Sequence, residues 1–267
     1  MPARRRFSTR RTPGSGADLN VAVCIKRVPE TGARITLTAD EQEIDTSYLG
    51  FTISPHEECA VEEALRLVER HGGTTTAVTL GPPAAAEQLQ NAVAMGVESA
   101  VLLETEGSDW DPQATAAALA DVLRGGGHDL LLFGNESADS GGYQVGIRVA
   151  HALGLPCVTG IKGIEIADGI ATVRREEGGG WEIFEVPLPA VITVKEGINL
   201  PRYASLPGRL RAKKLEIVRV EPAWREGDLR KQRLVVPQEQ GSHVELLGEG
   251  PAAAPRVVEV LKELGVA

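Results

Sequence analysis

The chain has 267 residues and a formal net charge of -9, from 28 lysine and arginine and 37 aspartate and glutamate residues. Its 42% hydrophobic and 24% charged residues are ordinary for a globular protein, which excludes disordered, collagen-like and solenoid classes. The acidic balance argues against non-specific nucleic-acid binding, because phosphate groups attract a basic surface.

Membrane-spanning and disulfide-rich classes are excluded as well. No stretch approaches the roughly 18 consecutive apolar residues of a spanning helix, so we do not expect an integral membrane protein. The three cysteines, Cys24, Cys59 and Cys157, are far apart and form no C-x-x-C pair, which fits neither a disulfide framework nor a zinc site. We therefore expect a soluble protein in a reducing compartment, the cytoplasm.

Residues 1–18 are predicted to be a disordered N-terminal extension. The first seventeen contain five arginines and no acidic residue. Such a segment is typical of an organellar transit peptide, which would place the protein in the mitochondrial matrix. Phe7 is, however, the only large apolar side chain besides Met1, so the segment has no amphipathic face. We exclude it from the fold.

From Asn20 onward, short apolar strands alternate with amphipathic helices. The predicted strands cover residues 20–26, 75–80, 100–103 and 129–133. The predicted helices start at residue 54, near 84, at 111 and after the loop that begins at 134. This alternation predicts βαβ units, and therefore a parallel sheet with helices on both faces.

The first helix has several start signals together. Ser54 can be its N-cap, Pro55 suits the first helical position, and Glu57 can complete a capping box. The helix is predicted to end at Gly72-Gly73.

The pattern changes after Gly160. Residues 161–166, 170–174 and 181–186 alternate like antiparallel strands, and residues 190–194 return as a buried strand. Residues 34–45 alternate like a hairpin excursion. Beyond Pro222 the chain is charged and weakly patterned until a last helix at 255–264, so this arm either lies on a partner chain or is disordered.

A long loop is the candidate ligand site. In open α/β sheets ligands bind beyond the carboxyl ends of the strands, where residues 24–28, 54–57, 80–83 and 134–146 meet. The last segment, GNESADSGGYQVG, is thirteen residues long, whereas such loops normally have about two to six. Its N–H groups and the helix after it predict an anion-binding nest, with Ser137, Asp139 and Ser140 available to a ribose or phosphate. We therefore predict a bound nucleotide, without a Walker or G-x-G-x-x-G motif.

Other residues give weaker indications of a catalytic or metal-binding site. No His, Cys, Asp or Glu group has metal-ligand spacing, and nothing resembles a nucleophile–base pair or a carboxylate dyad. His56 lies in the first turn of a helix directed at the ligand edge. Cys24 ends a buried strand, where a cysteine is most often a small apolar residue. We therefore expect no substrate chemistry of the chain's own.

Several motifs, in order along the folded chain, resemble those of one known family. They are VCIKRVPE (23–30), SPHEECAVEEA (54–64), AMGVESA (94–100), VRREEGGGWE (173–182), LPAVITV (188–194), NLPRYASLP (199–207) and AKK (212–214). From Asn20 to the C-terminus the chain resembles the β subunit of an electron transfer flavoprotein (ETF).

The resemblance implies an α/β, Rossmann-like fold of the adenine nucleotide α-hydrolase type, with a small antiparallel β excursion and an extended C-terminal arm. Residues 19–221 would form the nucleotide-binding domain, and residues 222–267 would pack on the α subunit of a heterodimer. In this family the α subunit holds most of the FAD. The β subunit closes over the flavin and binds AMP, or a second FAD in electron-bifurcating members.

Residue roles follow from the resemblance by position. The nucleotide pocket would be formed by Cys24, Ser54, Pro55, His56, Glu57, Leu80, Gly134, Ser137, Asp139, Ser140, Gly142, Tyr143, Gln144, Val145 and Gly146. His56 falls where the family places a side chain near the isoalloxazine ring. Residues 194–203 match the loop that docks on acyl-CoA dehydrogenases, with Ile198 at the position of its apolar anchor.

The loop departs from the family pattern G-(K/M)-Q-A-x-D-x-D-x-x-Q-(T/V)-G. Residues 135–137 replace its K-Q-A portion and residues 140–143 replace its acidic stretch, while Asp139, Gln144 and Gly146 remain. Tyr143 could stack on the base or obstruct it, and Gln144-Val145-Gly146 resembles the bifurcating subgroup. AMP and a second FAD both remain open.

The expected role is an electron carrier. A dehydrogenase would reduce the FAD held by the α subunit, and an acceptor of the ETF–quinone oxidoreductase type at the membrane would oxidise it. The alternatives are an electron-bifurcating subunit with a second FAD, a stand-alone adenine-nucleotide-binding module, and a purely structural role.

Overall fold

The computed structural model describes residues 18–30, 32, 34–106, 110–224, 229, 231–237 and 244–266. The prediction of a disordered extension falls, for residues 1–17, outside this described part. Contacts divide the chain into two compact units. The larger is built from the described residues up to Arg34 and from Asp45–Gln232, and the smaller from Ile35–Ile44 and Arg233–Ala267.

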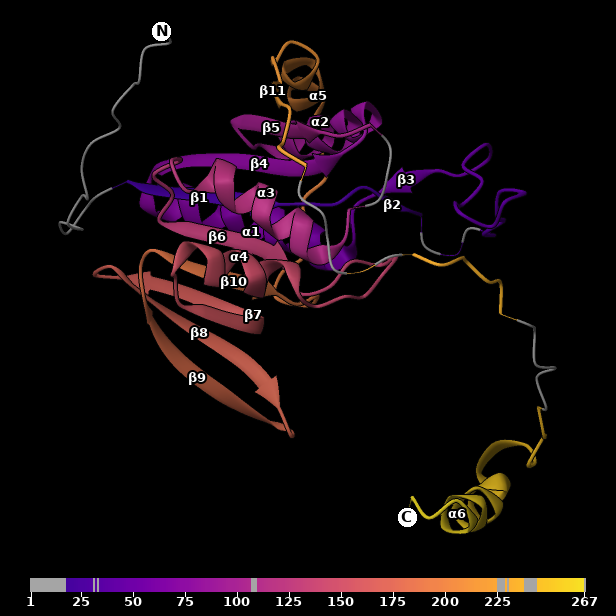
Figure 1. The fold of residues 1–267 in the computed structure, drawn as a ribbon. Helices are drawn as coiled ribbons and strands as arrows, with labels where there is room; N and C mark the ends of the chain where they lie inside the picture. Colours follow the sequence, from indigo (N-terminus) through magenta and orange to yellow (C-terminus); the bar gives the residue numbers. More distant parts are fainter. Residues whose placement is uncertain are drawn as a thin grey trace, which may run out of the picture. The chain divides into compact units, whose positions relative to one another are not determined.

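Within the larger unit, nine strands form one sheet in the order β11-β5-β4-β1-β6-β10-β7-β8-β9 (Figure 1). The strands are β1 (Leu19–Cys24), β4 (Gly73–Gly81), β5 (Ser99–Glu104), β6 (Leu130–Gly134), β7 (Cys157–Ala167), β8 (Ile170–Glu177), β9 (Gly180–Pro187), β10 (Ala190–Val194) and β11 (Val218–Val220). Neighbours from β11 to β7 are parallel, whereas β7, β8 and β9 are antiparallel. The predicted α/β architecture with an antiparallel excursion is confirmed.

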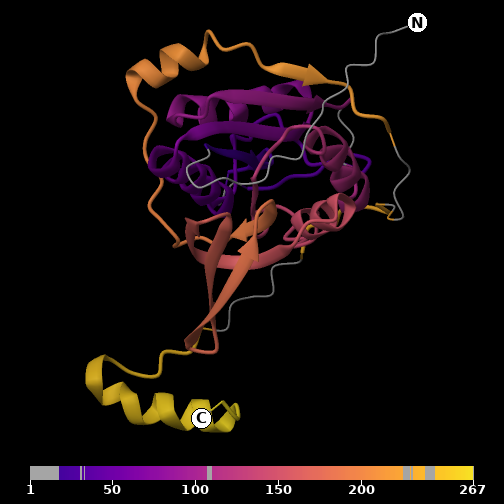
Figure 2. The same cartoon turned by 90° about the vertical axis from the view of Figure 1, so that its left-hand side faces the viewer.

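Helices cover both faces of the sheet (Figure 2). On one face lie α1 (Pro55–His71) and α2 (Ala86–Met95), the latter entered through the short helix η1 (Pro83–Ala85). On the other lie α3 (Pro112–Leu123) and α4 (Val145–Leu153). Alternate residues of β1 pack into the apolar cores on the two faces of the sheet, because successive strand side chains point to opposite faces. Val21 and Val23 pack with α1 and α2, and Ala22 and Cys24 pack with α3 and α4.

The strand order places a topological switch point at β1. The chain runs outward from β1 to β4 and β5 through α1 and α2, and then crosses to β6 on the other side of β1. Ligands of doubly wound sheets bind at such a point, beyond the carboxyl ends of the strands. Here those ends lead into residues 25–27 and into the loop after Gly134.

Some elements lie outside the sequence prediction. They are the antiparallel pair β2 (Val28–Pro29) and β3 (Phe51–Thr52), the helix α5 (Leu206–Ala212), and β11. Each is short, and α5 is held mainly by its packing on α2. Periodicity therefore gives little signal for them.

The smaller unit is described by itself. Residues 35–44 form a turn closed by one antiparallel bridge between Leu37 and Ile44, which is shorter than the predicted hairpin. The amide of Leu234 donates to the carbonyl of Glu41 at 2.8 Å. The predicted C-terminal helix is found as α6 (Ala254–Glu263), preceded by η2 (Gly250–Ala253). No helix in the described ranges of the chain is long and apolar enough to cross a membrane.

Candidate nucleotide site at the switch point

The N-terminus of α1 and the loop after β6 are joined by a direct hydrogen bond. The Ala138 amide donates to Ser54 Oγ at 3.0 Å. The predicted capping box of Ser54 and Glu57 is present, and in it the Ser54 amide donates to Glu57 Oε2 at 3.2 Å. The Ser54 hydroxyl also serves the loop. The cap residue of α1 therefore also fixes the loop.

Glu57 is a buried acid at the centre of this arrangement. Its side chain is 6% exposed, and Oε2 also accepts from the Lys26 amide at 3.1 Å, at the end of β1. Burial raises the pKa of Glu57 to about 8, although the hydrogen bonds from Lys26 and Ser54 and the Lys26 charge act in the opposite direction. The carboxyl is therefore mostly neutral at pH 7, and it links β1 to α1 without a full buried charge.

An ion pair closes the outer side of the site. Lys26 Nζ lies 2.5 Å from Asp139 Oδ2, and Asp139 Oδ1 accepts from the Ser140 amide at 2.7 Å. Burial alone would raise the pKa of Asp139, but the Lys26 charge and the hydrogen bonds hold that pKa below its usual value. The pair provides a cation and a fixed carboxylate at the mouth of the predicted nucleotide site.

His56 has an unsatisfied nitrogen. Its side chain is 12% exposed, and Nε2 lies 3.5 Å from Glu136 Oε1. Nδ1 is buried and has no hydrogen-bond partner among the described residues. Buried polar atoms are nearly always paired in folded proteins, so an orphan at this place indicates a group that binds there.

Close packing fixes the start of the loop. A Cβ on Gly134 would lie 2.6 Å from Glu57 Cγ and 3.3 Å from His56 Cβ, so only glycine fits between β6 and α1. On the other side, Thr193 Oγ1 donates to Asn135 Oδ1 at 2.8 Å and accepts from the Gly160 amide at 3.0 Å. The carboxyl ends of β6 and β10 are thereby joined to Gly160, within β7, beneath the loop.

The second half of the loop is more open. Tyr143 is 54% exposed and has a φ of 55°, a left-handed conformation that is uncommon for a residue with a side chain. A hydrogen bond to Glu136 raises the pKa of the Tyr143 hydroxyl. Gln144 precedes α4, and the N–H groups at the first turn of that helix have no acceptor within it. The anion-nest prediction depends on these amides of the first turn.

The structure thus brings some of the predicted site residues into direct contact. Those joined to one another by hydrogen bonds, ion pairs or close packing are Ser54, His56, Glu57, Gly134, Ser137, Asp139, Ser140 and Tyr143, partly through Glu136, Lys26 and Ala138. Cys24 and Leu80 lie in the core between the sheet and α3, and burial raises the pKa of the Cys24 thiol far above its usual value. These two residues support the site from below.

Sequence reasoning missed four residues of this network. Lys26 and Glu136 contact members of the predicted set without being in it, and Asn135 and Thr193 form a hydrogen bond with each other beside it. Lys26 and Thr193 stand at the carboxyl ends of predicted strands, which is the signal that could have found them. Asn135 and Glu136 depart from the family pattern, so the resemblance gives them no role.

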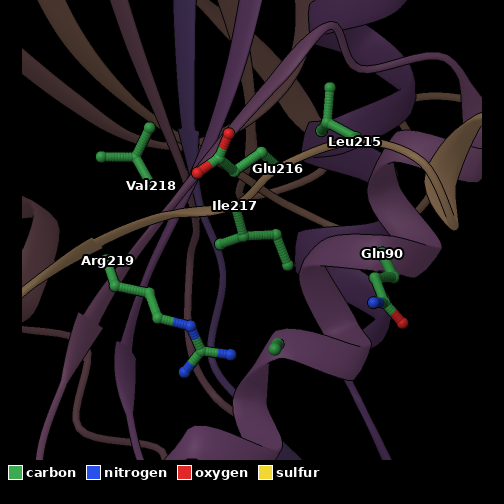
Figure 3. Close-up of a pocket in the computed structure, with 7 residues that line it drawn as sticks. Gln90, Leu215, Glu216, Ile217, Val218 and Arg219 are labelled. Atoms are coloured by element: carbon green, nitrogen blue, oxygen red, sulfur yellow. The ribbon is translucent and has the colours of Figure 1, made fainter.

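One cavity lies beside this site, and another lies away from it. One of about 280 Å³ is lined by Asn135, Tyr143, Ile147, Arg175 and Lys195 among others, on the side of the loop that faces β7 and β8. A larger one, of about 600 Å³, lies between α2 and the segment that enters β11 (Figure 3). Figure 3 shows Ile217 and Arg219 on that segment beside the helix that carries Gln90. The larger cavity shares no residue with the predicted nucleotide site.

Comparison with known proteins decides the family. The model of the electron transfer flavoprotein domain matches residues 43–224. The chain belongs to the electron transfer flavoprotein β-subunit family. It is 37% identical over 205 residues to the electron transfer flavoprotein subunit beta of Bacillus subtilis, covering 76% of this chain and 79% of the relative. The corresponding subunit of Syntrophomonas wolfei is 34% identical over 246 residues, 92% of this chain and 96% of the relative.

Membership of the ETF family confirms the resemblance seen in the sequence. It implies electron transfer by a flavoprotein and an α subunit as partner. A further relative of the same name, from Mycobacterium tuberculosis, is 38% identical over 205 residues, 74% of this chain and 77% of the relative. These relatives are bacterial, so the transit-peptide alternative for the first residues has no support.

Proposed function

We propose that the chain is the β subunit of a cytoplasmic ETF heterodimer. It carries electrons from flavin-dependent dehydrogenases, such as acyl-CoA dehydrogenases, to a quinone oxidoreductase at the membrane. The observation that supports this most is the junction of the α1 N-terminus with the 134–146 loop at the switch point. In a chain of this family, the junction supports the proposal of a nucleotide site at that edge of the sheet.

The residues present fit an adenine nucleotide. The amides at the first turn of α4 suit a phosphate, because a helix N-terminus favours negative charge. The hydroxyls of Ser137 and Ser140 lie 2.9 Å apart on the loop and suit a ribose or phosphate oxygen. We propose AMP as the nucleotide of this chain, with FAD held mainly by the α subunit.

His56 is the residue that we place beside the flavin. When bound, the flavin supplies the one-electron and two-electron redox chemistry of the carrier. Imidazole Nε2 lies 3.5 Å from Glu136 Oε1, and Nδ1 is buried without a hydrogen-bond partner among the described residues. Its part is to exclude water and to place a fixed dipole near the redox centre.

The docking surface for the donor lies next to the predicted anchor. Ile198 is half-buried and packs against the core below α1. The exposed apolar side chains follow it, with Leu200 82%, Tyr203 97% and Leu206 73% exposed. We propose that the donor dehydrogenase contacts these three side chains, because exposed apolar groups at the centre of an interface contribute most of its binding energy.

The smaller unit is proposed to pack on the α subunit. Helix α6 has no buried residue, and Val257, Val258 and Leu261 are 40%, 45% and 39% exposed. Arg256 pairs with Glu259 and Glu263 elsewhere on the helix. An amphipathic helix with an uncovered apolar stripe is stable only when that stripe is buried.

The test is to co-express the chain with its α subunit, purify the complex and identify every nucleotide released on denaturation. One FAD and one AMP per heterodimer is the expected result. Two FAD and no AMP would replace the simple carrier by the bifurcating alternative. A chain that stays monomeric beside the α subunit and carries no adenine nucleotide would contradict the proposal.

A further inference from the structure

The segment before α5 is fastened to the outer surface of α1. Asn199 Nδ2 donates to the Cys59 carbonyl at 3.0 Å and to Glu63 Oε2 at 2.9 Å. The guanidinium of Arg66 donates to the Leu200 carbonyl at 3.3 Å. Residues 198–203 have no secondary structure of their own, so these contacts with the helix determine their shape.

Arg202 makes the strongest of these attachments. Its Nε donates to Glu62 Oε2 at 2.8 Å, and its backbone amide donates to the same oxygen at 3.2 Å. The two terminal nitrogens reach Glu69, about two turns further along α1, at 2.5 and 3.0 Å. Arg66 Nε holds the other Glu62 oxygen at 2.6 Å. A planar guanidinium between two carboxylates fixes orientation as well as distance.

The charged groups of this cluster are buried beneath an irregular surface segment, and removing them from water costs free energy. Glu62 is 2% exposed and Glu63 is 7% exposed, yet both face the segment and not the sheet core. Burial alone would raise the pKa of Glu62, but the hydrogen bonds from Arg202 and Arg66 hold it below its usual value. Buried ion pairs contribute little net stability compared with apolar residues of similar size, whereas they do specify one geometry.

The other end of the segment is also immobilised. The Gly208 amide donates to Ser205 Oγ at 3.1 Å, and a Cβ on Gly208 would lie 2.1 Å from the Ala94 carbonyl of α2. Arg211 donates to the Val93 carbonyl at 2.8 Å. The exposed side chains of Tyr203 and Leu206 therefore project from a stretch that is fixed on both sides.

We propose that Arg202 and Glu62 are positioning residues, which hold residues 198–206 in the shape that an electron-donor flavoprotein recognises. This inference rests on the proposed docking of the donor at Leu200, Tyr203 and Leu206. Neither Arg202 nor Glu62 has to touch the donor. Their effect is to preform the surface, which lowers the entropy lost on binding.

The experiment uses the reconstituted heterodimer and four variants of this chain. Arg202→Gln removes the charged hydrogen bonds of Arg202 with Glu62 and Glu69, which we call the clamp. Arg202→Lys keeps the positive charge but not the planar guanidinium. Arg70→Gln is the matched control, because Arg70 lies on α1, the helix that the segment contacts, and makes none of the hydrogen bonds to residues 199–202 described above. Leu206→Ser tests the docking surface itself. The two readouts are hydrogen exchange of the 198–206 amides and reduction of the heterodimer by an acyl-CoA dehydrogenase with its substrate.

The expected results distinguish the positioning role of Arg202 from direct contact of the donor with the docking surface. Arg202→Gln should speed amide exchange in 198–206 by at least about tenfold and raise the KM for the heterodimer by about tenfold, with kcat and FAD content unchanged. Arg202→Lys should recover part of both losses, and Arg70→Gln should match the wild type. Leu206→Ser should raise KM without changing exchange.

Two results would overturn the inference. If Leu206→Ser raises KM but Arg202→Gln changes neither readout, the clamp has no positioning role while the docking proposal stands. If Arg202→Gln speeds exchange but neither it nor Leu206→Ser changes KM, donor docking at this surface is wrong, and the clamp inference fails with it.

Discussion

Replacing Glu57 with glutamine tests the central acid of the site. An ordinary glutamate has a pKa of 4.5, and burial raises that of Glu57 to about 8. Between these pH values the folded protein keeps a proton that the unfolded chain has lost. Each pH unit of this interval is worth about 1.4 kcal/mol. The contribution of Glu57 to stability is therefore fully present below pH 4.5 and falls by about 5 kcal/mol as the pH rises towards 8.

Urea unfolding at half-unit steps from pH 5 to 9 measures this effect. The difference in the free energy of unfolding, wild type minus Glu57→Gln, should fall by about 1.4 kcal/mol per pH unit up to about pH 8 and then level off. Glu185→Gln, on the exposed strand β9, is the matched control. A difference that stays constant over the whole range would refute the reasoning, because the carboxyl would then ionise at the same pH in both states.

Three further changes probe the site and the docking surface. Gly134→Ala places a Cβ 2.6 Å from the nearest side-chain carbon of α1 and should cost about 1–3 kcal/mol in urea unfolding, whereas Gly142→Ala, with no atom within 4 Å, should cost almost nothing. Ser54→Ala removes the acceptor of the Ala138 amide and should lower the free energy of unfolding by about 1 kcal/mol. It should also lower the AMP content of the heterodimer, and an AMP content equal to that of the wild type would contradict the proposed site. Leu206→Ser, at 73% exposure, should leave urea unfolding unchanged, and a lowered midpoint would show that the side chain has a structural role instead.

The sheet and its main helices were predictable because their signals are local. Buried runs such as residues 129–133 and start signals such as Asp111 give strand and helix directly. Asp111 caps α3 as expected, accepting from the Ala114 amide at 2.7 Å. Helix α5 was not predictable, since its position depends on Gly208 meeting the backbone of α2, a contact between residues far apart in sequence.

The position of the candidate site could be predicted from the sequence, but the hydrogen bonds and ion pairs within it could not. The length and composition of residues 134–146 indicated a ligand loop. The sequence could not show that the Ser54 hydroxyl also accepts from the Ala138 amide, because the N-cap rule concerns only the helix that the residue begins. It also gave no reason to pair Glu136 with both His56 and Tyr143, residues that meet only once the loop is folded.

The open edge of the sheet has a consequence for handling the protein. Strand β9 pairs with β8 alone within the described ranges, and β8 and β9 extend beyond the helices (Figure 1). Trp181 and Ile183 are 57% and 64% exposed there, which would favour pairing between the edges of two copies. Glu185 carries a negative charge on the strand and opposes that pairing, whereas Glu182 is paired with Arg175 of β8. Solutions of very high salt, which screen this repulsion, are therefore the conditions under which we expect the purified chain to aggregate.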